Sequence, residues 1–324
     1  MKRALFTLLR VAVSLGLLGY LISLADVNQI LAVLGRVNLQ LFVLAVAVFF
    51  LVVAILTFRW FIFTRTAGYQ VSYPRLFVLY LIGYFFNNFL PTTIGGDLSR
   101  AYYLSRLSGS RSGSVGIILM ERLMGLAATL TMASVALLWT QHLFHTPRIN
   151  YLTGLLLAGV VSVMLLLLHP RLFALQSRLT ARLTLFDLGL HLQHVMDRIH
   201  QFRTHKGVIA GTFLLSLSAH LLIALMNLVL ARALHLDQVQ LRILILLIPV
   251  TFVLGLLPSI NGLGVRDSGY VFLLVRMGLD PAEALALSFL NTLVPMLVSF
   301  LGGIAMLFYR HSEASQTSPA APEP

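Results

Sequence analysis

The 324-residue chain contains no cysteine, and only 10% of its residues are charged. The absence of cysteine excludes disulfide bonds and metal sites built on thiolate ligands. The scarcity of charge stands beside 58% hydrophobic residues and a mean hydropathy of +0.90. No single core of a soluble domain can bury that much apolar surface, so the composition predicts a polytopic membrane protein.

The charged residues that are present are mostly basic, with a formal net charge of +12. A charge of this sign would also suit a nucleic-acid partner. In so apolar a chain, however, basic side chains mark cytoplasmic loops and contacts with anionic lipids. We therefore expect membrane lipids as partners and no nucleic acid.

Apolar runs of spanning length predict six full membrane crossings. The first is the N-terminal stretch, which begins with charged residues like a secretory signal. It lacks a small-x-small cleavage site and precedes many further spans, so we interpret it as an uncleaved helix. The other five runs cover residues 39–58, 113–139, 150–168, 207–230 and 282–308.

Two further apolar runs, 75–90 and 242–257, end abruptly at Pro91 and Pro258. At about 1.5 Å per residue each is roughly 24 Å long, short of a hydrocarbon core of about 30 Å. A glycine-rich break and a second short helix, at 97–107 or 266–277, follow each run. We predict two re-entrant helical hairpins, which leave most basic residues, Arg59 among them, on the cytoplasmic side with both termini.

An internal repeat relates the two hairpins. A shift of 167 residues places Pro91 on Pro258, Gly95 on Gly262 and Tyr103 on Tyr270. Each repeat, about 1–145 and 146–310, holds three crossings and one hairpin, and an odd number of crossings inverts the second repeat relative to the first. We therefore predict one all-α transmembrane domain over 1–310, with an inverted-topology repeat whose hairpin tips meet near the midplane.

The first break carries the first candidate site. Backbone interrupted inside a bilayer is tolerated only where it lines a polar cavity or is buried in protein, because lipid offers it no hydrogen bonds. Gly95 and Gly96 allow the chain to reverse, Asp97 stands at the start of the second arm, and Arg100 lies on the same helix face. These two charges either serve a substrate path or only cap and neutralise the hairpin.

A second charged pair, Glu121 and Arg122, lies within an apolar run. Adjacent helix positions point about 100° apart, so each residue needs a partner from another segment, and the second hairpin offers Arg266 and Asp267. The acids Asp97, Glu121 and Asp267 with the bases Arg100, Arg122 and Arg266 make a neutral set. We expect Glu121 to pair with an arginine of one hairpin and Arg122 with an aspartate. The set is either an anion site beside glycine backbone, suited to a phosphate headgroup, or an ion-pair network that only locks the bundle.

Two segments outside the spans have a different character. Residues 170–204 combine leucines at helical spacing with arginines, which predicts an amphipathic segment on the cytoplasmic surface. The polar, proline-rich residues 311–324 predict a disordered tail. No metal-ligating motif occurs, and we expect no cofactor.

The segments NNFLPTTIGGDLSR, ERLMGL and LPSINGLGVRDSGY, in this order, resemble the lysylphosphatidylglycerol synthase transmembrane-region family of flippase-like proteins. The resemblance covers nearly all of residues 5–310. It implies movement of a lipid across the bacterial inner membrane. The chain has only a short tail after its last span, so we expect no soluble aminoacyl-transfer domain and no lysyl transfer. The positions that match by motif are Asn88, Pro91, Gly95, Gly96, Asp97, Arg100, Glu121, Arg122, Pro258, Gly262, Gly264 and Arg266.

The leading hypothesis is a translocator of an anionic phospholipid or a polyprenyl-phosphate-type lipid, not an enzyme. An ion-coupled secondary transporter of a soluble solute fits inverted repeats equally well. A membrane enzyme acting on a lipid carrier is the third alternative, although the chain lacks the usual catalytic motifs. The candidate substrate-binding residues are Asn88, Gly95, Gly96, Asp97, Arg100, Glu121, Arg122, Asn261, Gly262, Gly264, Arg266 and Asp267, with Pro91 and Pro258 as structural breaks.

Overall fold

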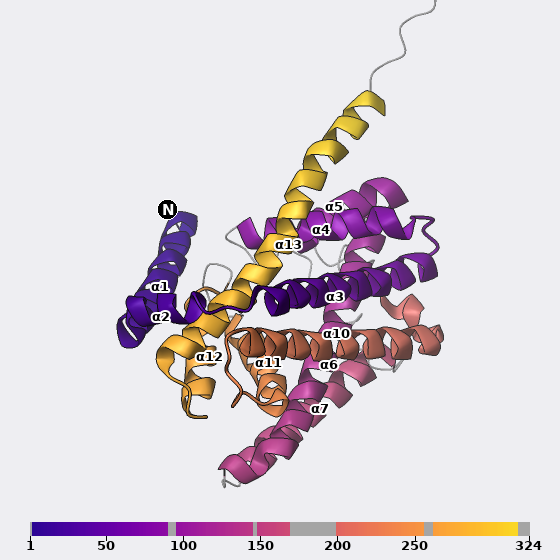
Figure 1. The fold of residues 1–324 in the computed structure, drawn as a ribbon. Helices are drawn as coiled ribbons and strands as arrows, with labels where there is room; N and C mark the ends of the chain where they lie inside the picture. Colours follow the sequence, from indigo (N-terminus) through magenta and orange to yellow (C-terminus); the bar gives the residue numbers. More distant parts are fainter. Residues whose placement is uncertain (1, 90–94, 145–147, 169–198, 256–261, 317–324) are drawn as a thin grey trace, which may run out of the picture.

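The computed structural model describes residues 2–89, 95–144, 148–168, 199–255 and 262–316, and over these residues it contains helices and turns but no strand (Figure 1). The prediction of an all-α protein is confirmed for this part of the chain. The elements are α1 (Lys2–Ala25), α2 (Val27–Leu34), α3 (Leu39–Thr66), α4 (Tyr73–Phe89), α5 (Gly95–Ser108), α6 (Arg111–Phe144), α7 (Arg148–Leu168), the 3-10 turn η2 (Phe202–Thr204), α10 (Lys206–Ala233), α11 (Leu241–Gly255), α12 (Val265–Val275) and α13 (Pro281–Gln316).

Four helices are long and apolar enough to cross a membrane, as expected of a polytopic membrane protein. They are α3, α6 as far as Trp139, α10, and α13 as far as Phe308. A fifth span results if α1 and α2 are counted together, although an 82° bend separates them. Asp26 makes this bend at a φ of 48°, and its side chain accepts a hydrogen bond from the Asn28 amide at 3.0 Å, which caps α2. The run predicted at 150–168 forms helix α7.

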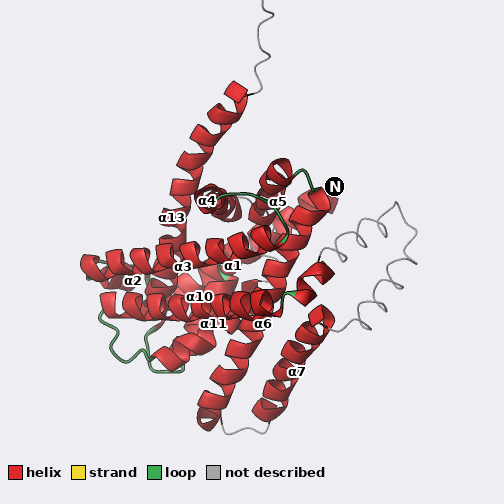
Figure 2. Ribbon diagram, turned by 90° about the vertical axis from the view of Figure 1, so that its right-hand side faces the viewer, coloured by secondary structure: helices red, strands yellow, loops and turns green. Residues whose placement is uncertain are grey.

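Helices α3 and α10 lie side by side at the centre of the molecule (Figure 1). Large apolar side chains of α3, such as Trp60 and Phe63, are fully buried. Helix α7 packs along α6, and the C-terminal part of α13 projects beyond the other helices (Figure 2). The outer faces carry many exposed leucine, valine and phenylalanine side chains, as suits helices solvated by lipid.

The helix boundaries repeat at the spacing found in the sequence. A shift of 167 residues places both ends of α3 on both ends of α10, and it carries α4, α5 and α6 onto α11, α12 and α13 within a few residues. Contacts are exchanged in the same way: α4 packs on α13 while α11 packs on α6, and α7 packs on α6 while α1 packs on α13. The two halves therefore share one backbone plan.

Two pairs of short helices, α4 with α5 and α11 with α12, occupy the positions predicted for the hairpins. Helices α4 and α11 have 17 and 15 residues, roughly 26 and 22 Å, less than a hydrocarbon core of about 30 Å. Pro91, Pro258 and Asn261 lie outside the described residues.

Glycine has a different role in each pair. Gly96 lies in the first turn of α5, and a Cβ atom there would be 2.2 Å from the carbonyl oxygen of Gly83 in α4. Its function is thus close helix contact, whereas the sequence interpretation gave it chain reversal. Gly262 and Gly264, before α12, do adopt positive φ values of 79° and 76°, which residues other than glycine rarely adopt.

The predicted surface segment at 170–204 falls mostly on residues 169–198, outside the described part. Residues 199–201 are helical and precede η2. Helix α13 extends to Gln316, into the segment predicted as a tail, and residues 317–324 are not described.

Candidate functional site

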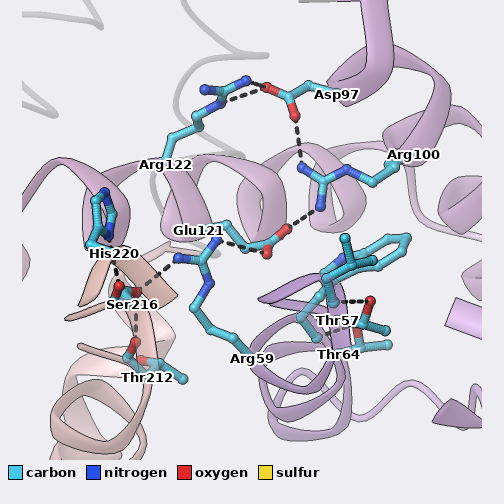
Figure 3. Close-up of polar contacts among 12 residues, drawn as sticks. Thr57, Arg59, Thr64, Asp97, Arg100, Glu121, Arg122, Thr212, Ser216 and His220 are labelled. Carbon is cyan, nitrogen blue, oxygen red and sulfur yellow. Dashed lines mark hydrogen bonds and ion pairs between the residues drawn. The ribbon is translucent and has the colours of Figure 1, made fainter. Parts of the chain in front are cut away.

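Five charged side chains of alternating sign form a continuous chain between α3, α5 and α6 (Figure 3). We call Arg122, Asp97, Arg100, Glu121 and Arg59 the charge ladder. Arg122 donates from Nε to Asp97 Oδ2 at 2.6 Å, and Arg100 donates to Asp97 Oδ1 at 2.7 Å. Arg100 also reaches Glu121 Oε2 at 2.8 Å, and Arg59 donates to Glu121 Oε1 at 3.1 Å. The expected pairing of Glu121 with a hairpin arginine and of Arg122 with an aspartate is confirmed.

Burial differs sharply along the charge ladder. The Glu121 side chain is 2% exposed, Arg59 and Arg100 are 7% and 8%, and Asp97 is 12%. These four charges sum to zero, as low-dielectric surroundings require of buried ions. Arg122 is the exception, with 53% of its side chain exposed. The ladder therefore ends in one accessible cation.

Two aromatic rings hold the centre of the charge ladder in place. The Arg100 guanidinium lies over the ring of Tyr80 at 4.4 Å and over that of Trp60 at 5.1 Å. Cation–π contact and the two carboxylates together fix its position from several sides. Arg100 thus joins α5 to α3, α4 and α6.

Arg59 is the residue that sequence reasoning missed. Because it follows an apolar run, the sequence predicts a residue that flanks a span on the cytoplasmic side. The side of the membrane stays a prediction, but the residue is buried in α3 and also donates to Ser216 Oγ of α10 at 2.8 Å. His220 donates from Nδ1 to the Ser216 carbonyl oxygen at 2.7 Å, and its Nε2 lies 2.9 Å from the Thr129 hydroxyl oxygen. A signal was present: Thr212, Ser216 and His220 recur every four residues in an apolar span, which marks one polar helix face.

The charges of the second half do not join the ladder, contrary to the neutral set of six that the sequence suggested. Asp267 accepts a hydrogen bond from the Gly264 amide at 2.8 Å and a second from the Ser288 hydroxyl. Arg266 donates to the Thr292 hydroxyl at 2.7 Å. Asp267 is satisfied by its own helix start and by α13, so it is not the partner of Arg122. Under the 167-residue shift, the Arg100–Glu121 pair corresponds to the Asp267–Ser288 contact.

Two adjoining cavities open beside these charges. The first, about 260 Å³, is lined by all five residues of the charge ladder. The second, about 370 Å³, is lined by Arg122 and Arg266 and by polar groups of α4, α10, α12 and α13. Arg122, Asn87 and His220 line both cavities. The accessible end of the charge ladder therefore stands where the two cavities meet.

Polar side chains of both halves form the wall of the second cavity. Asn227 donates to Asn291 at 3.1 Å and accepts from the Tyr270 hydroxyl at 2.6 Å, and all three line the cavity. Asn88 lies on the same wall. These side chains make the wall polar, which suits a ligand with a polar headgroup.

The structure brings six of the predicted site residues to the cavity walls: Asn88, Asp97, Arg100, Glu121, Arg122 and Arg266. Asp267 and Gly264 instead fix the start of α12, and Gly96 packs α5 on α4. Gly95 and Gly262 are not among the described residues that line either cavity, and Asn261 falls outside the described part of the chain. No cluster of potential metal ligands occurs among the residues that were placed.

Comparison with known proteins gives one family and one relative. The model of the family described as the lysylphosphatidylglycerol synthase TM region matches residues 7–303. The UPF0104 membrane protein MJ1595 of Methanocaldococcus jannaschii is 26% identical over 305 residues, which cover 87% of this chain and 89% of that protein. No solved structure matches the chain.

Proposed function

Since the chain belongs to the lysylphosphatidylglycerol synthase TM-region family, we propose that it translocates a lipid with an anionic headgroup, either a phospholipid or a polyprenyl-phosphate-type lipid. The observation that carries this proposal is the junction of two cavities at Arg122, a half-exposed cation within a helix long and apolar enough to span a membrane. The five residues of the charge ladder, three arginines and two carboxylates, carry a net charge of +1. Net charge within a membrane is costly, and a phosphate headgroup would offset it.

The proposal includes a topology. Six full crossings would be α1, α3, α6, α7, α10 and α13, with α4–α5 and α11–α12 as re-entrant hairpins of an inverted repeat. The short lengths of α4 and α11 and the exchanged helix contacts support this arrangement. The protein would lie in the bacterial inner membrane, with both termini on the cytoplasmic side.

The lipid headgroup would enter the cavities while its acyl or prenyl chains stay in the bilayer. Arg122 and Arg266 offset the headgroup charge, and the buried part of the charge ladder holds α3, α5 and α6 in register. The cycle makes and breaks no covalent bond, so the protein acts as a transporter and not as an enzyme.

Reconstituted liposomes test this function. Purified protein in vesicles with trace fluorescent phosphatidylglycerol, or a fluorescent prenyl phosphate, should expose the label of the inner leaflet to an external quencher faster than protein-free vesicles do. Arg122→Ala should reduce the rate close to background. Arg276→Ala, an exposed arginine stacked on Phe272, serves as the matched control and should keep the wild-type rate. A wild-type rate equal to that of empty vesicles for every lipid rejects the proposal.

A second candidate, an ion-coupled transporter of a soluble solute, is favoured by one observation. Glu121 is 2% exposed within a polar chain that continues through Arg59 to Ser216, and linked buried groups of this kind occur in proton relays. Proton uptake driven by a water-soluble ligand, without movement of labelled lipid, would select this function instead.

A further inference from the structure

The two cavities differ in the charged residues that line them. The first is lined by three arginines and two carboxylates of the charge ladder, which are linked by ion pairs in one continuous chain. The second is lined by Arg122 and Arg266, and no Asp or Glu occurs among its described lining residues. The break segments 90–94 and 256–261 also contain no acidic residue in their sequence.

Each carboxylate that the structure describes close to these cavities is already engaged. Glu121 lies between Arg59 and Arg100, and Asp97 lies between Arg100 and Arg122. The Asp267 carboxylate accepts hydrogen bonds from the Gly264 amide and from the Ser288 hydroxyl. A cationic ligand would have to displace an arginine from one of these contacts before it gained a counter-ion.

The two arginines of the second cavity retain capacity for a ligand. Arg122 is 53% exposed beyond its contact with Asp97. Arg266 donates from one Nη to the Thr292 hydroxyl, while its buried Nε has no hydrogen-bond partner within the described part of the chain. A buried donor without a partner is costly, and an anionic oxygen would satisfy it.

We propose that the second cavity selects headgroups by charge: it binds a phosphate headgroup of net negative charge between Arg122 and Arg266 and rejects an aminoacylated headgroup of net positive charge. This inference rests on the proposed function and narrows its substrate class. It also distinguishes the proposed substrate from lysylphosphatidylglycerol, the lipid that the family's description names. Phosphatidylglycerol carries one negative charge, whereas its lysyl ester adds two ammonium groups and has a net charge of +1.

Binding measurements on the purified full-length protein in detergent test the selection. The probes are dioctanoyl phosphatidylglycerol, its lysyl ester and dioctanoyl phosphatidylcholine, each titrated by calorimetry. Wild type should bind the phosphatidylglycerol at least about 10-fold more tightly than either of the others, since charge-assisted hydrogen bonds to phosphate are strong. Arg122→Gln and Arg266→Gln should each weaken that binding about 10-fold to 100-fold.

Two further variants separate charge from folding. Arg266→Glu should shift the preference toward the lysyl ester, a gain that a merely unfolded protein cannot show. Arg276→Gln, on an exposed arginine of the same half, should leave all three affinities unchanged. Each variant is compared with wild type by gel filtration, and the wild-type comparison of the three lipids decides the matter if a variant fails to fold.

The inference is overturned if wild type binds the lysyl ester as tightly as phosphatidylglycerol, or if it binds no phosphatidylglycerol. It is also overturned if folded Arg122→Gln and Arg266→Gln both keep wild-type affinity. Liposome transport distinguishes this failure from that of the proposed function. Equal translocation of both lipids refutes charge selection alone, whereas the function is refuted when neither of these lipids nor the fluorescent prenyl phosphate is translocated.

Discussion

Replacing Glu121 with glutamine is the most informative perturbation of the charge ladder. The substitution keeps the size of the side chain and removes one charge that two arginines share, Arg59 at 3.1 Å and Arg100 at 2.8 Å. Both arginines are more than nine-tenths buried. The variant therefore changes the electrostatics of the bundle with little change in packing.

The magnitude follows from the charge balance. The four buried members of the ladder sum to zero in the wild type and to one uncompensated positive charge in Glu121→Gln. Removing one partner of a buried ion pair costs about 3–5 kcal/mol of folding free energy, because the other charge stays in a low-dielectric site. We expect a loss of that size.

The double variant Arg59→Gln with Glu121→Gln restores the balance and supplies the control. Its buried charges again sum to zero, so it should be more stable than the sum of the two single losses by about 2 kcal/mol or more, within the range of couplings measured for contacting residues. Reversible unfolding in mixed detergent micelles, followed by circular dichroism, gives the unfolding free energies of the wild type, the two single variants and the double variant. Strict additivity, or a Glu121→Gln variant as stable as wild type, would refute the ion-pair reasoning.

Three further substitutions test the packing and the cavity wall. Gly96→Ala should lower the yield of folded protein steeply, because its Cβ would lie 2.2 Å from a backbone oxygen of α4, whereas Gly125→Ala, with its nearest neighbour at 3.9 Å, should fold normally in the same gel-filtration assay. Gly302→Ala should destabilise by at least about 1–3 kcal/mol in thermal unfolding, since its Cβ would lie 2.0 Å from another α4 carbonyl; an unchanged melting temperature contradicts the close α4–α13 contact. Tyr270→Phe should cost about 1 kcal/mol in denaturant unfolding by removing the 2.6 Å hydrogen bond to Asn227, and a neutral result would place the hydroxyl elsewhere.

The sequence predicted the backbone plan well. The 167-residue shift rests on local signals, proline and glycine breaks and the lengths of apolar runs, and these signals determine where helices start and stop. The same reasoning predicted that Glu121 pairs with a hairpin arginine and Arg122 with an aspartate, because charges inside a span need partners. It pointed to the second hairpin for them, whereas the structure supplies Arg100 and Asp97 of the first. The membrane orientation of the two halves stays a prediction.

Long-range pairing was less accessible. Nothing in the α3 sequence indicates that Arg59 turns inward, since that depends on which face of α3 packs against α10. The sequence likewise suggests that Asp267 is available to pair with an arginine, although its carboxylate accepts hydrogen bonds from Gly264 and Ser288. The need for glycine at Gly96 was recognised, but the reason, contact with α4, is visible only in three dimensions.

The unequal contacts at equivalent positions of the two halves have a mechanical consequence. Helices α5 and α6 are joined by two ion pairs, whereas α12 and α13 are joined by bonds from Asp267 and Arg266 to neutral hydroxyls. Separating α12 from α13 should therefore require less free energy than separating α5 from α6, so amide exchange should be faster in α12 than in α5. Conformational change would then be asymmetric, with the first half nearly stationary while the second half moves.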